Sequence, residues 1–70
     1  MQQITVKPFV DGKSWLLDHE GAEPMLFRSG AFAEAAARSL ARRLADAGVE
    51  TRTTVLLRDG AVAGSFVTRV

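Results

Sequence analysis

Residues 29–48, SGAFAEAAARSLARRLADAG, decide the fold because they predict the one long helix of the chain, over residues 30–47. Ser29 is typical of a residue that caps the first turn, and Gly48 is placed to end the helix in the left-handed conformation. At about 100° per residue, one arc of the helix collects apolar side chains. This arc contains Phe32, Ala33, Ala36, Ala37, Leu40, Leu44 and Ala47. Its alanines should let the helix pack closely on a sheet.

Charged side chains fall on the opposite side of this helix. Glu34 and Arg38 lie four residues apart, as do Arg42 and Asp46, and this spacing allows an ion pair along one helix face. Arg43 lies at the edge of the apolar arc, and two interpretations stay open for it. Either its stem covers a neighbouring aromatic ring while the guanidinium reaches solvent, or it anchors a carboxylate.

The residues after the helix predict a β-hairpin, with strands over 49–58 and 61–68 around Asp59-Gly60. Asp-Gly between β-rich segments is typical of a two-residue turn in which both residues have positive φ. Such a turn sets the register: Leu56 with Ala63, Val55 with Gly64, and Thr53 with Phe66. The helix should then cover the face that holds Val55, Leu57, Val62 and Phe66.

The first part of the chain repeats this pattern, with strands over 4–10 and 13–19 around Asp11-Gly12. The same kind of register pairs Val6 with Leu17 and Pro8 with Trp15. Pro8 cannot donate to a ladder and suggests an edge strand or a bulge. A short third strand follows at residues 25–28. The layout is ββ(β)αββ, which predicts a single domain over residues 1–70 of the α+β class, two-layered, with one helix on one face of a mainly antiparallel sheet.

Composition limits the possible classes of function. The 70 residues carry 9 Lys+Arg against 8 Asp+Glu and no cysteine, so disulfides and thiolate metal sites are excluded. No apolar run is long enough for a membrane span, and the N-terminal stretch lacks the layout of a secretion signal, so we expect a cytoplasmic protein. Although 47% of the residues are apolar, eleven of these are alanine. So thin a core favours a second subunit or another partner that covers more surface.

The inventory of catalytic groups is nearly empty. There is no tyrosine and only one histidine, His19, which lies between Asp18 and Glu20. Neighbours on a strand point to opposite faces, so these three groups cannot converge on a substrate by adjacency. The carboxylates have no recognised metal-ligand spacing. The sequence therefore predicts neither an enzyme nor a cofactor or metal site.

Arginine supplies seven of the nine cations, which leaves nucleic-acid binding open as an alternative. Arg38 and Arg42 share the exposed helix face, while Arg52 and Arg58 are expected on the sheet face away from the helix. Such surfaces can contact phosphates. Nearby carboxylates and the near-zero net charge argue against a continuous basic patch.

The helix-free sheet face is the surface that the sequence best predicts to be functional. A face left to water should show polar residues, but the predicted register places five apolar residues there: Phe9, Leu16, Leu56, Ala63 and Val67. Together they could form a contiguous patch of the kind that marks an interface. The simplest interpretation is a two-fold homodimer, and an exposed edge strand offers a second route to association.

The motif Gly12…Trp15, then Phe27, Glu34-Ala35-Ala36-Ala37-Arg38, Gly48 and Arg58-Asp59-Gly60, resembles a family of short uncharacterised bacterial domains. Their pattern is a hairpin with a glycine and a tryptophan, an Ala/Glu-rich helix, and a hairpin with an Arg-Asp-Gly turn. The chain departs from the family at Arg28-Ser29-Gly30 and in its more acidic first loop. The resemblance implies a fold and no activity.

The layout is also similar to N-terminal domains of some antitoxins and to small phage inhibitors of bacterial defence, including anti-CRISPR proteins. These comparisons imply a heterologous protein partner. The sequence thus predicts a small non-enzymatic protein-binding domain, homodimeric through the helix-free sheet face, with nucleic-acid binding and inhibitor or antitoxin roles as alternatives.

Overall fold

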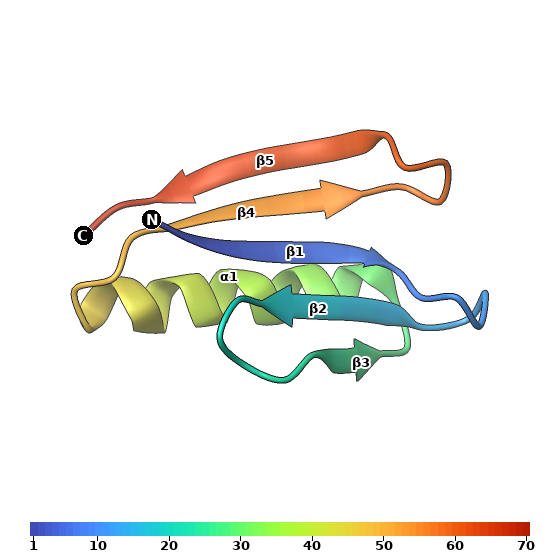
Figure 1. Cartoon of the computed structure of the whole chain (residues 1–70), viewed down its shortest axis with the longest axis horizontal. Coiled ribbons are helices and arrows are strands. Elements are labelled where there is room, and N and C mark those ends of the chain that lie inside the picture. Colours follow the sequence, from blue (N-terminus) through green and yellow to red (C-terminus); the bar gives the residue numbers. More distant parts are fainter.

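A five-stranded sheet carries the single helix on one of its faces (Figure 1). The computed structural model describes all 70 residues. Its elements are β1 (Gln2–Pro8), β2 (Trp15–His19), β3 (Met25–Phe27), α1 (Gly30–Asp46), β4 (Thr51–Leu56) and β5 (Val62–Thr68). The strand order is β3-β2-β1-β4-β5, and every neighbouring pair is antiparallel except β1 and β4. The predicted ββ(β)αββ order and the α+β class are confirmed.

The two ends of α1 form as the sequence predicts. The Ser29 side chain accepts a hydrogen bond from the backbone N–H of Phe32 at 3.1 Å, and Gly48, just past the helix, has a φ of 86°. Gly30 begins the helix against the indole ring of Trp15. A Cβ at this position would lie 3.1 Å from the ring, so glycine allows the helix N-terminus to approach β2 closely.

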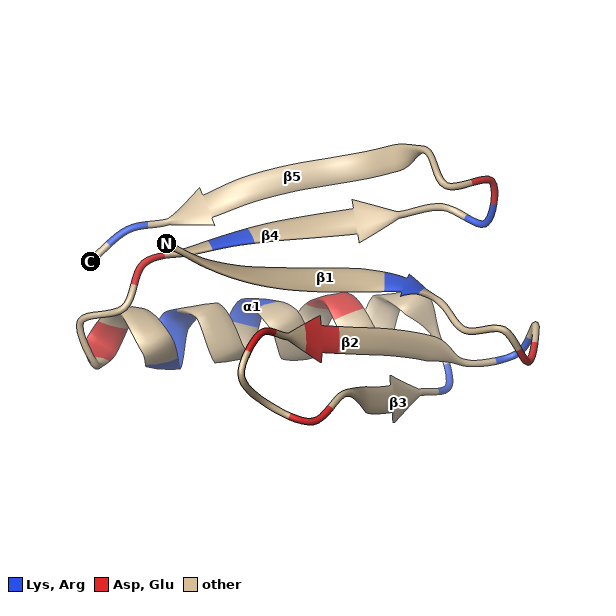
Figure 2. Ribbon diagram, viewed as in Figure 1, with Lys and Arg blue, Asp and Glu red and all other residues tan.

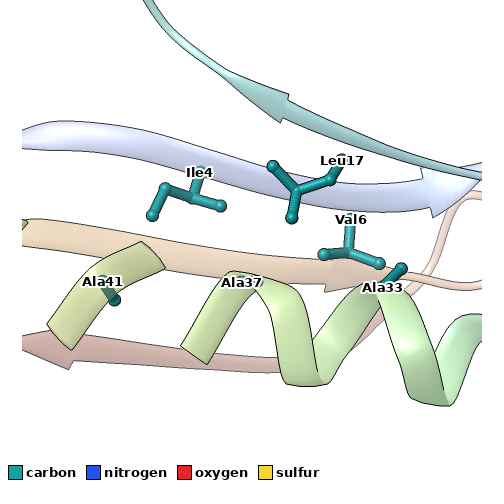
Figure 3. Close-up of a cluster of buried hydrophobic side chains, with 6 residues drawn as sticks. All are labelled: Ile4, Val6, Leu17, Ala33, Ala37 and Ala41. Carbon is teal, nitrogen blue, oxygen red and sulfur yellow. The ribbon is translucent and has the colours of Figure 1, made fainter. Parts of the chain in front are cut away.

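Alanine forms the centre of the contact between α1 and the sheet. Ala33, Ala37 and Ala41 are buried, and Figure 3 shows them beside the side chains of Ile4, Val6 and Leu17. The predicted apolar arc was therefore misplaced around the helix. Phe32 is 66% exposed and Ala47 is exposed, whereas Ala41, outside the predicted arc, is buried. The smallest side chains face the sheet because they allow the shortest distance between the two layers.

Few residues are fully buried. Six hydrophobic residues make up the core, with Trp15, Phe27, Ala36, Leu40, Leu44 and Val55 packed around it. Two threonines of β4, Thr51 and Thr53, are also buried beneath the helix, and neither hydroxyl has a hydrogen-bond partner. Since a buried polar group without a partner loses its hydration, these hydroxyls weaken the core.

Thr53→Val should therefore stabilise the fold. Valine keeps the shape of threonine and removes the unpaired hydroxyl, so we expect the free energy of unfolding to rise by about 1 kcal/mol. Urea unfolding followed by circular dichroism measures this change. The matched variant Thr54→Val, on the opposite sheet face, should change the free energy by less than about 0.5 kcal/mol. A destabilised Thr53→Val would contradict this account of the hydroxyl.

The second hairpin follows the predicted register only away from its turn. Val55 pairs with Gly64 and Thr53 with Phe66 as predicted, but Leu56 pairs with Val62 instead of Ala63. Gly60 has a φ of 86° and no other residue of this loop has positive φ, so the predicted two-residue turn is wrong. Hydrogen bonds from Gly60 N–H to the Leu57 carbonyl and from Leu57 N–H to the Ala61 carbonyl define a three-residue loop.

A bulge next to this loop restores the predicted register. The longer loop shifts the pairing by one residue, and the irregularity between Val55 and Leu56 shifts it back. The residues at this end of the hairpin, 57–63, are exposed. Leu57 is 46% exposed and Val62 is 60% exposed, so the prediction that the helix covers both side chains is wrong.

The first hairpin has the predicted register, with Val6 opposite Leu17 and Pro8 opposite Trp15. Its predicted two-residue turn is wrong, because the Phe9 N–H bonds to the Ser14 carbonyl around a four-residue loop in which only Gly12 has positive φ. The edge-strand interpretation of Pro8 is wrong, because β1 is the central strand. Pro8 is tolerated because β4 pairs with β1 only from Gln2 to Val6, so the missing N–H falls beyond this ladder.

Asp11 organises the loop of the first hairpin. Its carboxylate accepts hydrogen bonds from the backbone N–H of Ser14 at 2.8 Å and of Lys13 at 2.9 Å, and from the Ser14 hydroxyl at 2.7 Å. These bonds, together with the positive charge of Arg58, hold the pKa of Asp11 below its ordinary value of 3.8. A lowered folded-state pKa means that the ionised carboxylate stabilises the hairpin above about pH 3.8. This contribution is lost as the pH falls through the folded-state pKa.

An NMR titration of the Asp11 carboxyl should therefore give a midpoint below 3.8. Ser14→Ala removes the hydroxyl bond but keeps the backbone bonds, so it should raise the midpoint partway toward the ordinary value. A midpoint at or above 3.8 in the unaltered chain would contradict the role of Asp11 in this loop.

Candidate interaction surfaces

The open face of the sheet, defined as the face away from α1, carries leucines on three strands. Leu16 of β2 pairs with Leu26 of β3 on one side and with Lys7 of β1 on the other. Val6, the residue before Lys7, pairs with Val55 of β4, and Leu56 follows Val55. Lys7 thus lies on the same face beside the Leu16–Leu26 pair, and Leu56 lies on the neighbouring strand just past the end of the β1–β4 ladder. Leu26 is 53% exposed, and Leu16 and Leu56 are half-buried.

The five residues predicted for this face occupy three kinds of position. Leu16, Leu56 and Val67 belong to β2, β4 and β5, lie on the open face, and are half-buried. Phe9 lies one residue past the end of β1. Ala63 lies at the bulge in β5 and lines a hollow beside α1.

The apolar residues of the open face do not form one continuous patch. A cross-strand row of Asp18, Thr5, Thr54 and Ser65 separates the leucines from Val67, which pairs with Arg52. Leu26 extends the leucine row onto the edge strand β3, and the sequence did not predict it there. Its position on the open face follows from the two-residue alternation of β3 once the pairing of β3 with β2 is known.

A groove runs between α1 and β5 on the helix side of the sheet. Arg38 crosses it, with its guanidinium 3.1 Å from the Glu34 carboxylate and 4.4 Å from the centre of the Phe66 ring. This crossing divides the groove into hollows of about 320 and 350 Å³. The first is lined by Glu34, Arg38, Val55, Ala63, Gly64, Ser65 and Phe66, and the second by Arg38, Arg42, Ala45, Asp46, Phe66, Thr68 and Arg69.

The four arginines considered for nucleic-acid binding lie in three separate places. Arg38 and Arg42 border the groove, whereas Arg52 belongs to β4 and pairs with Val67 of the open face. Arg58 lies in the second hairpin loop, 5.8 Å from the Trp15 ring. Figure 2 shows acidic residues distributed among the basic ones along the whole chain. The structure does not gather these arginines into one basic surface.

Of the two helix pairs expected from the sequence, the Glu34–Arg38 ion pair is confirmed. Arg42 and Asp46 form no ion pair within 4.0 Å, and Arg43 is exposed with no carboxylate within the same distance. An anchoring role for Arg43 within this chain is therefore wrong, since no carboxylate of the chain reaches it.

His19 makes a structural contact at the end of β2. Its Nε2 lies 2.6 Å from Oε1 of Gln2, and the ring is half-buried. Asp18 belongs to the opposite face of the strand, as the two-residue alternation predicts. The structure contains no group of three histidine, cysteine, aspartate or glutamate side chains arranged to hold a metal ion. Its one helix is neither long enough nor apolar enough to cross a membrane.

Comparisons with protein-family models, with curated proteins and with solved structures find no match to this chain. The resemblance to short bacterial domains therefore stays a prediction.

Proposed function

We propose that this chain is a non-enzymatic protein-binding domain and that it associates with a second copy of itself through the open face. One observation carries the proposal. The helix covers a single face of the sheet, and the uncovered face presents Leu16, Leu26 and Leu56 on three different strands. Leucines on a sheet face with no covering layer are typical of a surface that another protein covers.

The small core supports self-association. Three of its six buried hydrophobic residues are alanines, which contribute little apolar area. Packing two open faces together would bury the leucines of both copies and give a layered arrangement of helix, sheet, sheet and helix. Lys7 is compatible with such a contact, because its aliphatic stem can lie between leucines while its ammonium reaches the rim.

Isologous contact also suits the charges of this face. Asp18 and Arg52 lie toward different edges of the sheet, on β2 and β4. Two open faces related by a two-fold axis can therefore set the acidic side of one copy against the basic side of the other. This complementarity favours a second copy over a partner of a single charge sign.

Sedimentation equilibrium tests the proposal. The unaltered protein should sediment with at least twice the 7.5 kDa chain mass, and Leu56→Asp or Leu16→Asp should halve the observed mass. A charge buried without a partner in the contact disfavours association. Val10→Asp is the matched control, because Val10 is 94% exposed in the first hairpin loop, and it should leave the mass unchanged.

Circular dichroism of each variant checks that the domain remains folded. A wild-type monomer at millimolar concentration would overturn self-association through this face. An equal loss of sedimenting mass in Val10→Asp would also count against the proposal. It would show that an added negative charge disrupts association wherever it is placed on the surface.

A further inference from the structure

The two edges of the sheet differ in how well they are protected. β3 is only three residues long and Pro24 precedes it, so it offers little for another strand to pair with. β5 is seven residues long and contains no proline and no charged residue. Edge strands normally carry charges, prolines or covering segments that prevent pairing with another chain. β5 lacks these devices, apart from the bulge near its start.

β5 receives the least cover of any strand from the helix. Figure 1 shows it as the outermost strand, on the far side of β4 from β1 and α1. Its residues from Val62 to Ser65 are exposed. Gly64 leaves an open space, because a Cβ at this position would meet no atom within 4 Å. Phe66 lies two residues after Gly64 on the same strand, so both lie on the same side of the sheet. The Phe66 ring is half-buried beneath Arg38.

We propose that β5 pairs antiparallel with β5 of a second copy, about a two-fold axis at Ser65, to form one continuous ten-stranded sheet. Ser65 is the midpoint of the strand Val62–Thr68, so this register overlaps the two strands from end to end and places Ala63, at the bulge of each copy, opposite Val67 of the other. It places Phe66 of one copy directly opposite Gly64 of the other. An aromatic ring beside a strand glycine covers backbone that the glycine leaves exposed, a favourable cross-strand arrangement.

The charges along the groove select this register over its neighbour. α1 and β5 run in the same direction (Figure 1), Glu34 and Arg38 both line the hollow beside residues 63–66, and the Arg38 guanidinium lies over the Phe66 ring. Because Glu34 precedes Arg38 by about one helical turn, it lies toward the Gly64 end of this hollow. A two-fold axis at Ser65 places Gly64 of one copy opposite Phe66 of the other. The end of the groove nearer Glu34 in one copy therefore faces the end nearer Arg38 in the second copy. An axis at Phe66 would instead set Arg38 toward Arg38 of the second copy. Opposite charges across an interface favour association and like charges oppose it.

This contact is independent of the open face. The pairing joins sheet edges, whereas the open-face contact stacks one sheet on another. Two different two-fold contacts on one chain can coexist, and if their axes are perpendicular they close into a tetramer. Loss of either contact therefore leaves the other measurable.

Disulfide trapping tests the register directly, because the chain contains no cysteine. Directly opposed residues of antiparallel strands have Cα atoms about 4.5–5.5 Å apart, within the range that a disulfide spans. Ser65→Cys should therefore give a crosslinked dimer on mild oxidation. Val67→Cys is the matched control on the same strand and sheet face, and the proposed register would separate its two copies by about 13 Å along the strands. We expect Ser65→Cys to crosslink at least about tenfold faster than Val67→Cys.

Each outcome bears on the proposal. Equal rates at the two positions would indicate random collision, and faster crosslinking at Val67 would indicate another register, so both results overturn it. Absence of crosslinking at Ser65 in a folded variant also overturns it. Leu56→Asp combined with Ser65→Cys should still crosslink, which separates failure of this contact from failure of the open face.

A second variant measures the same contact without oxidation. Ser65→Lys places a charge at the centre of the edge and should halve the sedimenting mass, while circular dichroism stays unchanged because Ser65 is exposed. An unchanged mass would overturn the pairing.

Discussion

The close contact between the alanine side of α1 and the central strands is the constraint on which the rest of the structure depends. Ala33, Ala37 and Ala41 lie against strands that present Ile4, Val6 and Leu17. Because alanine adds so little bulk, the helix lies close to the sheet, and packing there is efficient for a chain of 70 residues. The use of alanine at this contact also limits the apolar area that the helix can bury.

A single helix resting closely on the sheet covers only its central strands. α1 packs mainly on β1, β4 and β2, and least on β5. The groove beside β5 follows from this narrow cover, the free edge of β5 follows from its terminal place in the sheet, and the open face remains because the chain has only one helix. The surfaces proposed for association are thus consequences of how the core is built, and a second copy would complete the burial that one copy begins.

Local signals were sufficient to predict the elements of this fold. Ser29 and Gly48 mark the ends of α1 because capping depends on neighbouring residues alone. The register of the first hairpin was also predictable. In the second hairpin a three-residue loop and a bulge compensate each other, so the pairing of Val55 with Gly64 was predicted although the turn was not. Asp-Gly is compatible with either turn, and the choice depends on the bulge, which has no sequence signal of its own.

Features that depend on how the elements pack together were harder to predict. The parallel pairing of β1 with β4, which makes Pro8 part of a central strand, joins residues far apart in the chain. Helix rotation depends on which side chains fit closest to the sheet, so Phe32 was misplaced. For the candidate surfaces, alternation predicted Leu16 and Leu56 on the open face, but Leu26 and the separation of the arginines depend on strand order.

The central claim is that α1 stabilises the central strands by itself and leaves β5 to a second copy. Amide hydrogen exchange measured across a range of protein concentration tests this claim most directly. The account predicts that the Ile4 and Val6 amides are already strongly protected in dilute protein, whereas the β5 amides are weakly protected when dilute and gain protection as the concentration increases. Protection of β5 that stays constant from micromolar to millimolar protein would contradict it.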